Sequence, residues 1–132
     1  MAQDHVAVSL AAAPDAVWAV VGDFDGIDKL FPNLEGLRIE DSADGHDRVL
    51  TMFGMDIRER FISKDDDARV LVYSVLSIPG VELEHHQGTI TVTSEGEGSH
   101  VTWAFDVAPD AMIDLFKGTY TGALGDLEKY FA

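Results

Sequence analysis

The stretch EHHQGTITVTSEGEGSHVTWAFDV, residues 84–107, decides the fold. Its apolar residues alternate with polar ones, as they do in β-strands that bury one face. The turn Glu95-Gly96-Glu97-Gly98 divides it into two strands, which we place at 84–94 and 99–107. Closing this hairpin pairs Ile90 with Trp103, so the apolar side chains of both strands share one face. The stretch therefore predicts an antiparallel hairpin with one buried face.

The same period of two extends toward the N-terminus as far as residue 34. Glycine- or aspartate-rich turns interrupt it about every ten residues, which predicts short connections between consecutive antiparallel strands. The four strands that we expect there lie at 36–42, 46–53, 56–64 and 69–78. A further strand is expected at 5–10. Together these segments predict a seven-stranded antiparallel sheet.

Three segments are typical of helices. Residues 13–21 and 25–30 predict two short helices after the first strand, the former with Pro14 in its first turn. Residues 109–131 predict one long helix whose apolar face is formed by Met112, Leu115, Phe116, Thr119, Tyr120, Ala123, Leu124 and Leu127. Three glycines interrupt it, at 118, 122 and 125. They indicate close packing, a bend or room for another group, and we favour close packing.

A sheet with one apolar face needs a cover, and the last helix is the only element long enough. The sequence thus predicts an α+β fold, a curved sheet wrapped around a long C-terminal helix, as a single domain over residues 1–132. Strongly bent sheets covered by one helix often leave a hollow between the two layers, so we look for polar residues on the inner face.

Composition excludes several functions. The absence of cysteine rules out disulfides, thiolate catalysis and cysteine-ligated zinc. The net charge of −15 argues against nucleic-acid binding and anionic membranes. No signal peptide or apolar run of about 20 residues is present, so we expect a cytoplasmic protein without stable membrane insertion. His85 and His86 are adjacent, so they diverge in a strand, and the other three histidines are scattered; we therefore expect neither a metal nor a cofactor.

The order of elements resembles the START-like or SRPBCC superfamily, in particular its polyketide cyclase/dehydrase branch. The matching segments are Ala13-Pro14-Asp15-Ala16-Val17-Trp18, Gly22-Asp23-Phe24, Phe31-Pro32, Glu59-Arg60-Phe61, Leu71-Val72-Tyr73 and Gly98-Ser99-His100-Val101-Thr102-Trp103. This resemblance implies a helix-grip fold with a ligand cavity between the sheet and the C-terminal helix. It implies no reaction, because such folds host many functions. Two departures stand out: His86 replaces an aromatic residue of many relatives, and Pro79-Gly80-Val81 differs from their usual loop.

His86, Arg48 and Glu59 are the candidate catalytic residues. The hairpin pairing places His86 on the apolar face, and histidine is suited to proton transfer near neutral pH. A wall histidine that shapes the pocket is the competing interpretation. Arg48 and Glu59 are polar residues on another apolar face, and burying either alone is costly. They form a structural ion pair, or Arg48 anchors a ligand oxygen and Glu59 orients it.

Tyr73 and Tyr120 could each donate a hydroxyl to a ligand carbonyl, with core packing as the alternative. The face of Tyr73 depends on the register of the Asp65-Asp66-Asp67 turn, which the sequence leaves open. Aromatic and flexible side chains complete the expected ligand-binding wall: Trp103, Phe116, Phe61, Phe31 and Met112.

Three functions are compatible with these residues. The first is binding of a small hydrophobic molecule, such as a polyketide, isoprenoid, fatty acyl or aromatic metabolite. The second is a polyketide cyclase or dehydratase in which His86 acts as general acid or base. The third is a protein-interaction module with a vestigial cavity. The expected partner is a small hydrophobic molecule, and a homodimer is an open alternative.

Overall fold

A computed structural model describes residues 1–132. The seven strands are β1 (Ala2–Leu10), β2 (Gly36–Ser42), β3 (Gly45–Met52), β4 (Met55–Asp65), β5 (Val70–Ser77), β6 (His85–Glu95) and β7 (Gly98–Ala108). The helices are α1 (Pro14–Val21), the 3-10 helix η1 (Phe24–Lys29), the 3-10 turn η2 (Asp110–Met112) and the long α2 (Ile113–Tyr130). The predicted α+β fold class is confirmed.

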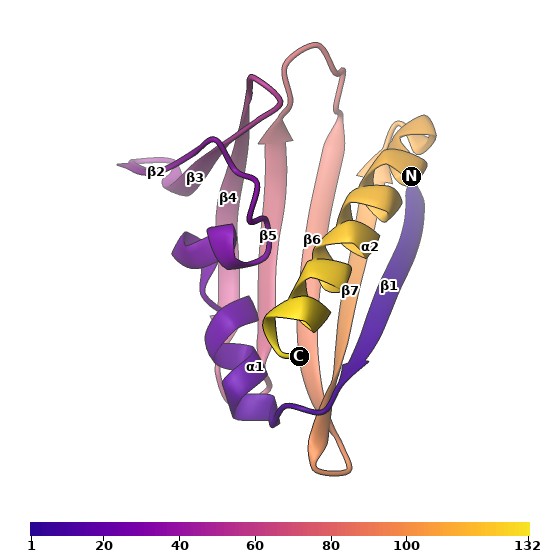
Figure 1. Cartoon of the computed structure of the whole chain (residues 1–132). Helices are drawn as coiled ribbons and strands as arrows, with labels where there is room; N and C mark the ends of the chain where they lie inside the picture. Colours follow the sequence, from indigo (N-terminus) through magenta and orange to yellow (C-terminus); the bar gives the residue numbers. More distant parts are fainter.

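The strands form one antiparallel sheet in the order β1-β7-β6-β5-β4-β3-β2. The sheet curves but does not close into a barrel, and α2 lies across its concave face, with α1 below (Figure 1). The predicted hairpin register is confirmed, since Ile90 pairs with Trp103. The structure contains no helix that combines the length and the hydrophobicity needed to span a bilayer.

Two elements begin elsewhere than the sequence predicts. Strand β1 starts at Ala2 because its first residues pair with the end of β7, where Ala2 lies opposite Val107. The C-terminal helix opens as a 3-10 turn, in which the Met112 amide donates to the Pro109 carbonyl at 3.0 Å, and becomes α-helical only at Ile113. Both differences depend on contacts with residues distant in sequence or on local turn geometry.

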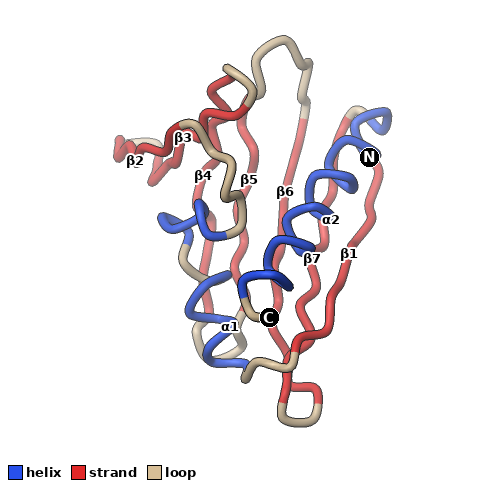
Figure 2. The backbone as a smooth tube through the Cα atoms, in the orientation of Figure 1, coloured by secondary structure: helices blue, strands red, loops and turns tan.

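The pairing of β5 with β6 covers only part of β5. It runs from Val70–Thr91 to Tyr73–Gly88, and beyond Gly88 the two strands separate toward the long loop that joins them (Figure 2). Gly88 is required at the last pair, because a Cβ there would lie 2.6 Å from the Tyr73 ring. This pairing places Tyr73 on the inner face, which the sequence could not decide.

The core lies between the concave face of the sheet and the helices. Helix α2 contributes one buried stripe, formed by Phe116, Tyr120, Ala123, Leu124 and Leu127. The expectation that the α2 glycines pack closely is wrong. A Cβ added to Gly118, Gly122 or Gly125 would meet no atom within 4 Å, so these glycines border open space.

Candidate functional site

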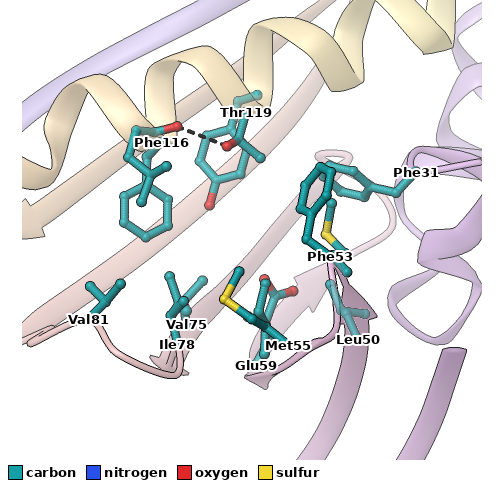
Figure 3. A pocket seen from close by; sticks show the side chains of 14 residues that line it. Phe31, Leu50, Phe53, Met55, Glu59, Val75, Ile78, Val81, Phe116 and Thr119 are labelled. Carbon is teal, nitrogen blue, oxygen red and sulfur yellow. Dashed lines mark hydrogen bonds between the residues drawn. The ribbon is translucent and has the colours of Figure 1, made fainter. Parts of the chain in front are cut away.

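A cavity of about 240 Å³ lies between α2 and the open half of the sheet (Figure 3). Strands β3 and β4 and their turn supply Leu50, Met52, Phe53, Met55, Ile57 and Glu59. Helix α2 supplies Leu115, Phe116, Thr119 and Tyr120, and the remaining wall is formed by Phe31, Val75, Ile78 and Val81. Twelve of these 14 residues are hydrophobic. The cavity forms where β5 and β6 separate and no longer bring their side chains together.

A wider groove of about 590 Å³ adjoins the cavity on the side of α2. The two hollows share Phe31, Met52, Phe53, Leu115 and Thr119. Gly118 and Gly122 line the groove, and their missing side chains keep it open. The cavity therefore connects to the surface along this side of the helix.

Phe53 lies at the rim of both hollows, in the tight turn between β3 and β4. Its side chain is 87% exposed, and its backbone is left-handed with φ of 52°. This conformation is costly for a residue with a bulky side chain and usually belongs to glycine or asparagine. An exposed phenylalanine is thus held at the cavity mouth against its local backbone preference.

Five polar residues at and behind the cavity wall form a continuous group that we call the polar layer: Arg48, Glu59, Tyr73, His86 and Tyr120. The Tyr73 hydroxyl donates to the Tyr120 hydroxyl at 2.7 Å. His86 Nε2 lies 2.8 Å from the same Tyr120 oxygen. From β7, the Trp103 indole N–H donates to the Tyr73 hydroxyl at 3.0 Å, and its ring stacks on that of Tyr120.

His86 occupies the gap between β5 and β6. Its Nδ1 accepts the Val75 backbone N–H at 2.9 Å, and its carbonyl accepts the Ser74 hydroxyl. The side chain thus replaces a strand carbonyl as partner for β5. Because Nδ1 accepts, the neutral ring carries its proton on Nε2 and donates it to Tyr120. Burial lowers the pKa of His86 to about 3, so the ring stays neutral at physiological pH.

Arg48 and Glu59 lie directly opposite each other on β3 and β4. Arg48 Nε donates to Glu59 Oε1 at 2.7 Å, and Nη1 donates to the Phe24 carbonyl at 2.7 Å. The guanidinium also lies over the Phe24 ring at 4.0 Å and the Tyr73 ring at 5.0 Å. Its charge is therefore paired, hydrogen-bonded and covered, as a buried arginine requires.

Glu59 places the negative group of this ion pair at the cavity wall. Its Oε1 also lies 2.7 Å from Arg48 Nη2, whereas Oε2 accepts no hydrogen bond from the chain. In Figure 3 the Glu59 carboxylate points from the floor toward the hollow. The carboxylate is a hydrogen-bond acceptor that a ligand can reach.

Burial and the negative charge of Glu59 raise the pKa values of Tyr73 and Tyr120. For Tyr120, the neighbouring Tyr73 is a further cause. Both phenols therefore keep their protons throughout the physiological range. The site has two permanent hydroxyl donors rather than a phenolate nucleophile or base.

The structure separates the candidate residues into three groups. Glu59, Tyr120, Phe116 and Phe31 line the cavity. His86, Arg48, Tyr73 and Trp103 lie behind this wall and are linked to it by the contacts above. Phe61, which packs edge-on against Phe24, and Met112, partly buried against the core, are not at the wall.

Several wall residues were outside our candidate set. Leu50 and Ile57 share the face of Arg48 and Glu59, so strand alternation could have identified them. Ile78 and Val81 lie in or beside the loop after β5, where no periodic pattern applies. No three or more histidine, aspartate or glutamate side chains gather as metal ligands.

Comparisons with known proteins agree with this geometry. The family profile described as "Polyketide cyclase / dehydrase and lipid transport" matches residues 1–132. The protein XoxI from Bacillus cereus is 26% identical, with a TM-score of 0.86 over 99% of this chain and 96% of that one. A Thermobifida fusca protein is 24% identical, with a TM-score of 0.83 over 99% of this chain and 93% of that one.

A plant protein shares the same fold at lower identity. The major latex-like protein 151 from Panax ginseng is 16% identical, with a TM-score of 0.75 over 98% of this chain and 97% of that one. No functionally curated protein matches the sequence. Since the family profile spans the whole chain and the fold is the helix grip, this protein belongs to the polyketide cyclase/dehydrase and lipid transport family of the START-like/SRPBCC superfamily.

Proposed function

We propose that this protein binds a small hydrophobic molecule in the cavity between the sheet and α2. The supporting observation is the wall, in which 12 of 14 residues are hydrophobic around a volume of about 240 Å³. Apolar walls with a few placed polar groups are typical of small-molecule sites, and this volume lies just below their common range of about 300–1,000 Å³. The ligand is accordingly small.

The state of His86 favours binding over catalysis. A general acid or base must reach the proton that it transfers. Both ring nitrogens of His86 already have partners in the protein, and the ring does not line the cavity. With its pKa lowered to about 3 by burial, the ring is also neutral and only weakly basic at pH 7, so no imidazolium is present to act as general acid. These features support a histidine that shapes the pocket.

A cavity-filling variant tests the proposal. We expect naphthalene and nonane to bind the wild-type protein with one-to-one stoichiometry in calorimetry and to raise its melting temperature, since ligands that bind only the folded state stabilise it. In Val81→Trp, the indole occupies the cavity, and both effects are lost. Ile39→Trp, on an exposed position of β2, is the matched control and retains both.

Two results would contradict the proposal. One is the absence of binding by either hydrocarbon to the wild-type protein. The other is equal binding to wild type and Val81→Trp, provided that the variant is folded by circular dichroism. Either result would favour the alternative function, a protein-interaction module with a vestigial cavity.

A further inference from the structure

The hydrogen bonds around Tyr120 leave one donor proton without a partner. Four groups bring one proton each: the Trp103 indole, the Tyr73 hydroxyl, the Tyr120 hydroxyl and His86 Nε2. Only three contacts join these groups, namely Trp103 to Tyr73, Tyr73 to Tyr120 and His86 to Tyr120. One proton of the four therefore has no acceptor within the group.

The remaining proton is that of Tyr120. Its oxygen accepts from Tyr73 and from His86 Nε2, whose donor role is fixed because Nδ1 accepts the Val75 N–H. Tyr120 is 3% exposed, so bulk water does not readily accept its hydroxyl proton. Tyr120 nevertheless lines the cavity, whereas Tyr73 does not. A buried donor without an acceptor is destabilising, and an acceptor on a ligand removes that penalty.

The other hydroxyl of the wall is not available in this way. Thr119 donates its proton to the Leu115 carbonyl at 2.9 Å, the bond drawn as a dashed line in Figure 3. The cavity therefore has one free hydroxyl donor, on Tyr120, in a wall that is otherwise almost entirely apolar.

Charge at the wall decides what kind of acceptor can enter. The Glu59 carboxylate points toward the hollow, and its Oε2 accepts no hydrogen bond from the chain. Arg48 is paired with Glu59 and hydrogen-bonded to the Phe24 carbonyl. A ligand carboxylate would meet a like charge without a counterion, in a weakly screening environment. The overall charge of −15 acts in the same direction.

We propose that the cavity selects neutral apolar carbonyl compounds, such as ketones and esters, by a hydrogen bond from Tyr120, and that Glu59 rejects the corresponding carboxylates. This inference rests on the proposed hydrophobic-ligand function and names its ligand class. It excludes free fatty acids and aromatic acids as preferred ligands at neutral pH. A ligand that also carries a hydroxyl can donate it to Glu59 Oε2.

Two matched series test the selection by calorimetry at pH 7. One series is acetylnaphthalene, ethylnaphthalene and naphthoate, substituted at the same ring position. The other is nonanone, nonane and nonanoate. In at least one series the ketone should bind about three- to tenfold more tightly than its hydrocarbon, the factor for one net hydrogen bond. The carboxylate should bind most weakly.

Variants assign the selection to its residues. Tyr120→Phe should abolish the preference for ketone over hydrocarbon and the infrared red shift of the bound ketone carbonyl. Thr119→Val is the matched hydroxyl deletion and should keep the ratio of the two affinities, even where both change. Glu59→Gln, which keeps an oxygen for Arg48 but removes the charge, should raise carboxylate affinity relative to ketone affinity.

The outcomes separate the two proposals. If hydrocarbons bind but ketones bind no better, or if carboxylates bind most tightly, the selection is wrong and the hydrophobic-ligand function stands. If Tyr120→Phe, folded by circular dichroism, keeps the ketone preference, Tyr120 is not the donor and the inference fails. If no member of either series binds, the proposed function fails as well.

Discussion

The two halves of the interface under α2 are built on the same sheet face and the same helix, yet one is solid and the other hollow. In the filled half, β6 and β7 are paired along their whole length, and Ile90, Val92, Val101, Leu124 and Leu127 are fully packed. In the hollow half, β5 is no longer paired with β6, and Leu50, Val75 and Phe116 face the cavity.

The polar layer lies along the boundary between these halves. Apolar side chains alone would collapse into a void, because dispersion contacts are lost around empty space. Here Arg48, Glu59, Tyr73, His86 and Tyr120 fix one another through directed hydrogen bonds and an ion pair. In this protein, directed polar contacts border the hollow half of the core, whereas apolar packing holds the filled half together. The variants below change residues of the polar layer or residues next to the cavity.

The largest effect is expected from Arg48→Met. It leaves the Glu59 charge without its buried partner, which typically costs about 3–5 kcal/mol of stability. Urea unfolding followed by fluorescence measures the loss. The double variant Arg48→Met/Glu59→Leu is the control and should recover most of it, because no charge remains unpaired. A single variant as stable as wild type would show that the pair does not support the boundary.

Acid should lower the free energy of unfolding through protonation of His86. Its pKa is lowered from 6.5 to about 3 in the folded state, so the unfolded state binds the proton first as the pH falls. This contribution to stability is complete above pH 6.5 and decreases as the pH falls toward 3, by on the order of 3 kcal/mol at pH 4. His86→Asn, which keeps an acceptor for Val75, should show a smaller loss over this range.

Denaturant unfolding at several pH values measures this difference between wild type and His86→Asn. Nitrogen chemical shifts of the His86 ring give an independent reading, and they should report the Nε2–H tautomer at pH 7. A ring that titrates near pH 6.5 would contradict the neutral, buried histidine.

Gly88→Ala, in β6, should destabilise the protein by disturbing the polar layer. The added Cβ would lie 2.6 Å from the Tyr73 ring and push its hydroxyl away from Tyr120. Such overpacking costs about 1–3 kcal/mol. Gly118→Ala is the matched control, because its Cβ meets open space in a helix, and it should stabilise by about 1 kcal/mol. Equal effects of the two substitutions on the midpoint of thermal unfolding would refute this reading of the packing.

The smallest effect is expected at the rim. Phe53→Asn places a residue that tolerates the left-handed backbone in the β3–β4 turn, and we expect up to about 1 kcal/mol of added stability. Naphthalene should at the same time dissociate faster, because an aromatic side chain is removed from the cavity mouth. Stopped-flow fluorescence measures the rate, and an unchanged rate would show that Phe53 does not cover the ligand.

The strands, the long helix and the pairing within hairpins could be predicted from the amino-acid sequence. These depend on local signals, namely the period of two, the turn residues and the apolar stripe of α2. Alternation also placed Arg48 with Glu59 on one face, and His86 on the apolar face of β6. The resemblance carried by segments from Ala13 to Trp103 indicated the family, which the profile match then showed.

The place where the sheet opens, and the roles of the polar residues there, are set by contacts that exist only in the folded chain. The β5–β6 pairing ends at Tyr73–Gly88, and the neighbouring β4–β5 register contains two irregularities; no local pattern encodes either feature. The roles of His86 and Tyr120 depend on which of their atoms accept and which donate, across chain separations of 11 to 47 residues. Alternation along a strand gives the face of a side chain, whereas its hydrogen-bond partners are chosen by strands and helices that meet only in the folded chain.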